Sequence, residues 1–190
     1  MRRAEKRQHL VDTAAELFNR HGYHAAGVDK VIAEAGIAKT TLYRHFKSKD
    51  ELIVAVLKRI DETYRDDLRK RVEASDGDGR GRLLATFDFL ADWFEGQAFY
   101  GCPFMSAAGE YGDPDNPVFR EAANHKRLVI AYFEELAESA GFADPIRVAR
   151  EINLLHEGAT AVAHIFRDPS NAAAAKTMAA SFLATAEMRG

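Results

Sequence analysis

The residues best suited to chemistry lie in one short polar segment near the N-terminus. Directly after the turn Gly36-Ile37-Ala38, the chain carries basic, hydroxyl and phenol side chains at Lys39, Thr40, Thr41 and Tyr43. Such groups donate hydrogen bonds to phosphate oxygens and to acceptors on base edges. The turn needs a residue that tolerates a positive φ, and Gly36 is one. The spacing predicts a helix-turn-helix whose second helix enters the DNA major groove.

Apolar periodicity predicts the helices that would position this segment. A first helix over 3–21 has one apolar face made by Leu10, Ala14, Leu17 and Phe18, with helical spacing. Two shorter helices are predicted over 28–35 and 39–46, and Gly36 ends the first of them. In the second, Leu42 and Phe46 form the inner stripe, so the polar residues face outward. Tyr43 packed on the first helix, and His45 bonded locally, remain alternatives.

Net charge supports a polyanion partner only at one end of the chain. The 190 residues are 47% apolar and 29% charged, with a net charge of −3, which is an ordinary globular composition. Residues 1–49 carry ten Lys or Arg and five acids, whereas the remainder carries 16 and 24. A basic end on an acidic body is typical of a nucleic-acid-binding protein, although solvated surfaces of chance composition would give the same pattern.

A longer pattern surrounds the polar segment. Residues 36–52 read GIAKTTLYRHFKSKDEL, and Ala14 to Phe18 and His21 to Tyr23 precede them. Over about residues 5–57 the chain resembles the TetR/AcrR family of transcriptional regulators. The resemblance implies an all-α fold with an N-terminal helix-turn-helix DNA-binding domain, 1–48, and a C-terminal helical ligand-binding and dimerisation domain, 49–190.

The resemblance also implies which residues meet DNA. The expected contacts are Lys39, Thr40, Thr41, Tyr43, Arg44, His45 and Lys49, with Lys49 on a phosphate near the start of the following helix. For Arg44 a solvated surface charge remains the alternative. Ala38 and Gly27 stand where the family often has Ser, Thr or Asn, and neither can cap a helix with its side chain.

The rest of the chain is predicted to be helical too. Ser48 and Glu51 form a capping box for a helix over 49–74, which the glycine-rich residues 76–81 interrupt. Further helices are predicted over 82–97, once within 99–111, and over 117–140, 145–167 and 172–188. Asp144-Pro145 reads as the cap and first residue of the penultimate helix.

A small-molecule pocket is expected among the aromatic residues in the middle of the chain. Pockets are mostly apolar with a few polar groups. The predicted lining is Trp93, Phe94, Phe104, Tyr111, His125, Tyr132 and His156, with an ordinary aromatic core as the alternative. Homodimerisation is expected through the last two helices, whose small residues permit close approach. The predicted contacts are Ala159, Val162, Ile165, Phe182 and Leu183, with a tight intrachain core as the alternative.

Other chemistries have weaker support. Cys102 precedes a short predicted helix and could sense electrophiles or oxidants, but no basic residue adjoins it in sequence, and an inert structural thiol is the alternative. One cysteine excludes an internal disulfide. His21 and His24 lie at a turn, while His156 and His164 are too far apart for helical metal ligation. Nucleophile-elbow, P-loop, dinucleotide and HExxH motifs are absent, so no enzyme activity, metal or cofactor is expected.

These observations converge on one interpretation. The chain is predicted to be a cytoplasmic, homodimeric regulator without membrane segments or a signal peptide. It would bind double-stranded DNA at a palindromic operator as a repressor, and an unknown small-molecule effector would release it. A transcriptional activator and a small-molecule-binding helical protein with a vestigial DNA domain are the alternatives.

Overall fold

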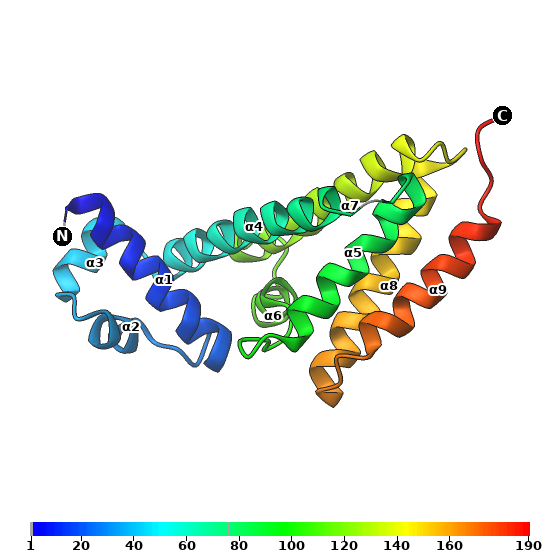
Figure 1. The fold of residues 1–190 in the computed structure, drawn as a ribbon. Helices are drawn as coiled ribbons and strands as arrows, with labels where there is room; N and C mark the ends of the chain where they lie inside the picture. The colour runs from blue at the N-terminus through cyan, green and yellow to red at the C-terminus, as the bar shows by residue number, and fades with distance from the viewer. Residues whose placement is uncertain (1, 76) are drawn as a thin grey trace. The chain divides into compact units, whose positions relative to one another are not determined.

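The computed structural model describes residues 2–75 and 77–190, and over them the chain is helical. The helices run as follows: α1 Arg3–His21, α2 Val28–Ala35, α3 Lys39–His45, α4 Lys49–Glu73, α5 Gly79–Glu95, α6 Pro103–Glu110, α7 Pro117–Ser139, α8 Pro145–Phe166 and α9 Asn171–Thr185 (Figure 1). Within the described ranges the only β-type pairing is an isolated bridge between Phe142 and Met188. The all-α prediction is confirmed.

Two compact units make up the chain. The first comprises residues 1–63 and 103–125, and the second comprises 64–102 and 126–190. Helices α4 and α7 each contribute residues to both units. The predicted division into a DNA-binding domain, 1–48, and a ligand-binding and dimerisation domain, 49–190, concerns function and stays a prediction.

In the first unit, α1 to α3 form a small core in the way that their periodicity predicts. Leu10 and Ala14 of α1 are fully buried, and so are Val31 of α2 and Leu42 of α3. Gly36 adopts the left-handed conformation, with φ 62°, and the next amide, that of Ile37, donates to the Ile32 carbonyl at 3.2 Å. This closes α2 with the αL cap that glycine favours and lets α3 start within three residues.

The start of α4 differs in one detail from the predicted capping box. The Glu51 amide donates to Ser48 Oγ at 3.1 Å, as predicted. The Glu51 carboxylate, however, accepts from the Lys47 amide at 2.7 Å rather than from Ser48. The carboxylate still binds a backbone donor just before the helix, where negative charge is favourable.

In the second unit, α5, α8 and α9 lie side by side (Figure 1). Their core contains fully or nearly fully buried Phe87, Leu90, Phe133, Ile152 and Ala179. Helix α5 starts at Gly79, three residues before the predicted start at residue 82. The reason is Asp78, whose carboxylate accepts from the Gly81 amide at 2.8 Å. This cap offsets the poor helix propensity of the two glycines in the first turn.

The prediction for the last helix was too long. Helix α9 ends at Thr185 rather than near Met188. Beyond it the backbone pairs with the segment after α7, because the Ala143 amide donates to the Glu187 carbonyl at 2.9 Å and the Arg189 amide donates to the Gly141 carbonyl at 2.8 Å. These bonds satisfy backbone groups that a longer helix would satisfy internally.

Candidate DNA-binding surface and effector region

Helix α3 presents the side chains that the sequence predicts for DNA contact. Leu42 is fully buried, whereas Lys39, Thr40, Tyr43 and Arg44 are exposed. Thr41 and His45 are partly buried. Ala38 caps α3 through its backbone alone, and its carbonyl accepts from the Thr41 amide at 2.8 Å. A seven-residue helix thus buries its apolar stripe and leaves a polar face in solvent.

Two predicted phosphate contacts are engaged within the protein. Lys39 Nζ lies 2.9 Å from Asp29 Oδ1, and this hydrogen bond holds the pKa of the lysine above its ordinary value. Lys49 Nζ donates to the His24 carbonyl at 3.1 Å. A solvated ammonium has three donors, so these bonds leave capacity for a phosphate oxygen.

Basic side chains of α1 extend the polar face of α3. The pKa of His45 lies below its ordinary value because the ring is partly desolvated and because Arg3, Arg7, Arg44 and Lys6 repel its charged form. The Arg7 guanidinium also lies 5.1 Å from the centre of the Phe46 ring. The start of α1 and the end of α3 therefore form one basic surface, suited to phosphate groups.

Comparison with known proteins gives the family. Residues 10–56 match the sequence model of the protein family described as "Bacterial regulatory proteins, tetR family". A solved TetR-family transcriptional regulator from Streptomyces coelicolor is 31% identical, with 96% of each chain covered and a TM-score of 0.89. The chain belongs to the TetR family of transcriptional regulators.

Two curated relatives have opposite regulatory names. The transcriptional activator FasR of Mycolicibacterium smegmatis is 40% identical over 93 residues, which span 49% of this chain and 42% of FasR. The transcriptional repressor NemR of Escherichia coli is 25% identical over 171 residues, which span 86% of each protein. Similarity therefore supports transcriptional regulation and leaves the sign of the response open.

Three of the predicted effector contacts lie in the first unit of this TetR-family chain and have partners there. The ring of Phe104 stacks on His125, with centroids 3.6 Å apart and planes at 6°. His125 Nδ1 donates to the Asp61 carboxylate at 2.7 Å, and both side chains are buried. Tyr111 donates to Asp50 at 3.3 Å. Burial, together with the carboxylates of Asp50 and Glu110, raises the pKa of Tyr111 to about 12.

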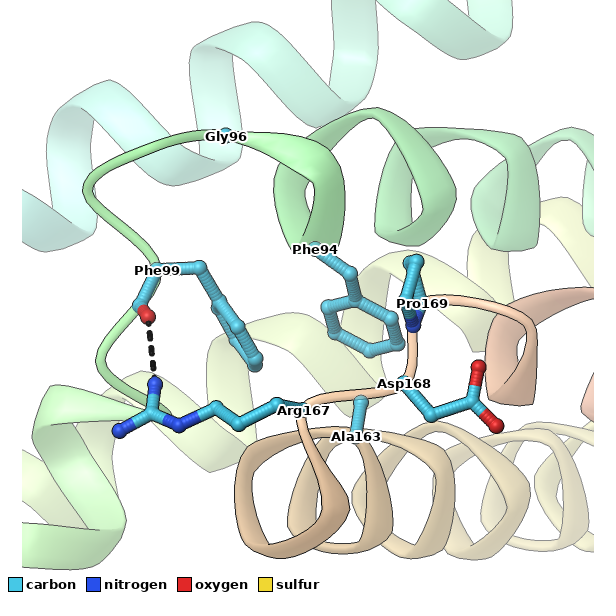
Figure 2. Close-up of a pocket in the computed structure, with 7 residues that line it drawn as sticks. All are labelled: Phe94, Gly96, Phe99, Ala163, Arg167, Asp168 and Pro169. Atoms are coloured by element: carbon cyan, nitrogen blue, oxygen red, sulfur yellow. Dashed lines mark hydrogen bonds between the residues drawn. The ribbon is translucent and has the colours of Figure 1, made fainter.

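The other four predicted effector contacts lie in the second unit. Trp93 packs edge to face with Tyr64 and with Phe99, and the Arg69 guanidinium lies over the ring of Tyr132, 4.1 Å from its centre. Phe94 lines a pocket of about 170 Å³ with Phe99, Ala163 and the residues 167–169 after α8. Figure 2 shows this pocket, with Arg167 donating to the Phe99 carbonyl at 3.2 Å. The pocket is smaller than a typical drug-sized site.

His156 is the predicted effector contact with an unsatisfied atom. Thr86 donates its hydroxyl hydrogen to the Leu83 carbonyl at 2.6 Å, so its oxygen must accept from His156 Nε2, 2.8 Å away. The ring is therefore protonated on Nε2, and buried Nδ1 is an acceptor that has no hydrogen-bond partner among the residues that the structure describes. Burial, with a contribution from the Lys126 charge, lowers the pKa of His156 to about 3, so the ring is neutral.

A polar cluster in the second unit was not found from the sequence. Lys126 Nζ donates to both carboxylate oxygens of Glu157, at 2.6 and 2.8 Å, and to Cys102 Sγ at 3.4 Å. Burial disfavours the ammonium, but Cys102 and Glu157 outweigh it, so the pKa of Lys126 lies above its ordinary value. No basic residue is adjacent to Cys102 in the sequence, but one is adjacent to it in the fold. Lys126 of α7, 24 residues later in the chain, lies within hydrogen-bond distance of the thiol.

The predicted dimer contacts divide between the surface and the core. Ala159 and Leu183 are 6% and 2% exposed and belong to the core of the second unit, so their side chains have little area left for a partner. Val162 and Ile165 are exposed, as are Leu154 and Phe166 of α8 and Met178 of α9, while Phe182 is partly buried.

Residues 2–75 and 77–190 show neither a membrane-spanning helix nor a metal-binding cluster. Every helix there is too short or too polar to cross a lipid bilayer. The same ranges hold no cluster of three or more His, Cys, Asp or Glu side chains placed to bind a metal ion.

Proposed function

We propose that the chain is a sequence-specific DNA-binding regulator that acts as a homodimer and responds to a small molecule. The observation that carries the proposal is the exposed polar face of α3 over a buried Leu42. Thr40, Thr41 and Tyr43 would contact DNA in the major groove, and residues 1–48 would form the DNA-binding domain. Lys39, Arg44, His45 and Lys49, with the basic start of α1, would contact phosphates.

The proposed dimer uses the outer faces of α8 and α9. On α8, Leu154 and Val162 lie eight residues apart with the exposed Gly158 midway between them, and Ile165 follows three residues later, so they form one stripe. Leu154 and Ile165 are each 69% exposed and Phe166 is 71% exposed. Large exposed side chains of this kind mark an interaction surface. A second copy would cover this stripe through a two-fold axis, because most homodimers are symmetric.

The proposed effector site lies in the second unit near His156. Its Nδ1 is a buried acceptor, and the Phe87 and Phe133 rings lie 4.3 and 4.8 Å from the imidazole. A mostly apolar compound with one hydroxyl or N–H donor would satisfy that acceptor. An unsatisfied buried acceptor costs about 1–3 kcal/mol, which is free energy that such a ligand recovers on binding.

We propose that this regulator acts as a repressor and not as an activator. NemR, which matches over 86% of both chains, is named a repressor, whereas FasR, which is named an activator, matches over about half of this chain. We assign no catalytic reaction, because the family is one of regulators. The proposed place of action is the cytoplasm, where DNA is accessible.

Selection of bound duplexes from a random DNA library, at two salt concentrations, tests the proposal. Enrichment of a palindrome whose affinity falls steeply with salt is the expected result. A refolded, ligand-free sample that enriches no sequence at low salt would contradict DNA binding and would favour the alternative of a small-molecule-binding protein.

A further inference from the structure

Glu110, the last residue of α6, binds the loop between α1 and α2 through backbone groups. Its Oε1 accepts from the Tyr23 amide at 2.8 Å, and its Oε2 accepts from the His24 amide at 2.6 Å. Its backbone carbonyl accepts from His24 Nε2 at 2.8 Å. One residue of α6 therefore makes three hydrogen bonds to two consecutive loop residues, 86 and 87 positions earlier in the chain.

The loop is shaped to receive this carboxylate. Gly22 has a φ of +82°, and a Cβ built on it would lie 3.0 Å from Glu110 Oε1. A side chain at this position would meet both backbone strain and the carboxylate. Glycine therefore allows the amides of Tyr23 and His24 to turn toward α6.

Further contacts hold the same loop from other directions. The Tyr23 hydroxyl donates to the carbonyl of Pro103, the first residue of α6, at 3.0 Å. The imidazole of His24 stacks on Tyr111 at 4.7 Å. Lys49 of α4 donates to the His24 carbonyl. The peptide groups of His24 are thus bonded to α6 through the N–H and to α4 through the carbonyl.

We propose that Glu110 is a positioning residue for DNA binding: its carboxylate fixes residues 22–24 and so restricts the freedom of α2 and α3, which follow that loop. The inference rests on the proposed DNA-binding function. A recognition helix that is ordered only part of the time has a reduced apparent affinity, in proportion to the ordered fraction. Two charge-assisted bonds to backbone amides are strong enough to set that fraction.

The direction in which DNA affinity changes when Glu110 is replaced distinguishes a positioning role from an effect of its negative charge alone. Removing an acid near a DNA-binding surface strengthens binding when charge alone acts, because less like charge faces the phosphates. If Glu110 positions the loop, loss of its hydrogen bonds to the Tyr23 and His24 amides, called here the Glu110 clamp, weakens DNA binding instead. In Glu110→Gln one amide keeps an oxygen acceptor and the other faces an NH2 group, whereas Glu110→Ala removes both acceptors. Glu95→Gln is the matched control, because Glu95 also ends a helix and is exposed.

The test measures amide hydrogen exchange and DNA affinity on the full chain. The DNA probe is a labelled duplex selected with wild-type protein. In Glu110→Ala we expect exchange at Tyr23 and His24 to accelerate about tenfold or more and affinity to fall about tenfold, with smaller changes in Glu110→Gln and neither change in Glu95→Gln. If the alanine variant does not fold, Glu110→Gln carries the test.

The outcomes distinguish this proposal from the one on which it rests. Wild-type protein that selects no duplex refutes the DNA-binding function, and the exchange data then still decide whether the clamp exists. Wild-type protein that binds DNA, with Glu110 variants that keep wild-type affinity or wild-type exchange at residues 23 and 24, refutes the positioning role.

Discussion

Replacement of His125 by phenylalanine is expected to destabilise the first unit strongly. His125 on α7 donates to Asp61 on α4 at 2.7 Å, and the two side chains are 3% and 7% exposed. Phenylalanine keeps a ring against Phe104 but cannot donate to the carboxylate. The change leaves the buried Asp61 carboxylate without this hydrogen bond, and removing one partner of such a buried pair costs about 3–5 kcal/mol. With a urea dependence of about 2 kcal/mol/M, the unfolding midpoint should fall by about 1.5–2.5 M.

A double-mutant cycle isolates the interaction from the change in packing. Asp61→Leu and His125→Phe are each expected to be destabilising, whereas the double variant replaces both polar groups by apolar ones. Such replacements are often neutral, so the double variant should be more stable than the sum of the single costs predicts, by at least about 2 kcal/mol. Urea unfolding followed by circular dichroism gives the four free energies.

A longer ion pair between the same two helices is the control. Lys58 of α4 lies 3.9 Å from Glu121 of α7, and the two side chains are 60% and 14% exposed. Lys58→Met should cost less than about 1 kcal/mol, because the contact is long and its lysine is largely in solvent. Two results would contradict the importance of burial. One is that the losses of unfolding free energy in Asp61→Leu and His125→Phe simply add in the double variant. The other is that Lys58→Met loses as much unfolding free energy as His125→Phe.

Three further predictions follow from the structure. Because the pKa of folded His156 is about 3 and that of an unfolded histidine is about 6.5, the unfolded chain takes up the proton first. The free energy of unfolding should therefore fall by up to about 1.4 kcal/mol per pH unit as the pH drops from 6.5 toward 3. Urea titrations at several pH values should show that His156→Gln lacks this part of the pH dependence. Equal pH dependence of the unfolding free energy in the variant and the wild type would contradict the prediction. Lys49→Ala should weaken binding to all duplexes alike and lower the slope of log affinity against log salt by about one, while Thr40→Ala should relax base preference; an unchanged slope would remove Lys49 from the phosphate contacts. Ile165→Asp with Phe166→Asp should raise the dimer dissociation constant at least about 100-fold by sedimentation, whereas Met105→Asp on α6 should not, and a dimer that survives the double change would place the interface elsewhere.

The helices could be predicted where local pattern decides them. Leu10 and Ala14 repeat with helical spacing, and Gly36 is the residue that an αL cap needs. The start of α5 was missed because glycine propensity argues against a helix there and the compensating cap, Asp78, is a single side chain. The end of α9 depends on pairing with residues 141–143, which no local pattern reveals.

In the candidate sites, too, features within one short segment could be predicted, and features that join distant residues could not. The polar face of α3 could be predicted because its buried stripe and its exposed residues belong to one short helix. The Glu110 clamp could not, since the carboxylate and the amides that it binds are more than 80 residues apart. The bond between Lys126 and Cys102 was hidden for the same reason, because the two residues lie 24 positions apart and only the fold brings them together.

The central claim is that two copies of α3 read two halves of one operator. The most direct measurement compares affinity for the selected palindrome with affinity for a duplex of equal length in which one half is scrambled, at fixed salt. We expect one dimer to bind each palindrome, and scrambling one half to lower the affinity at least about 100-fold. Equal affinity for the two duplexes, or one subunit per site, would contradict the claim.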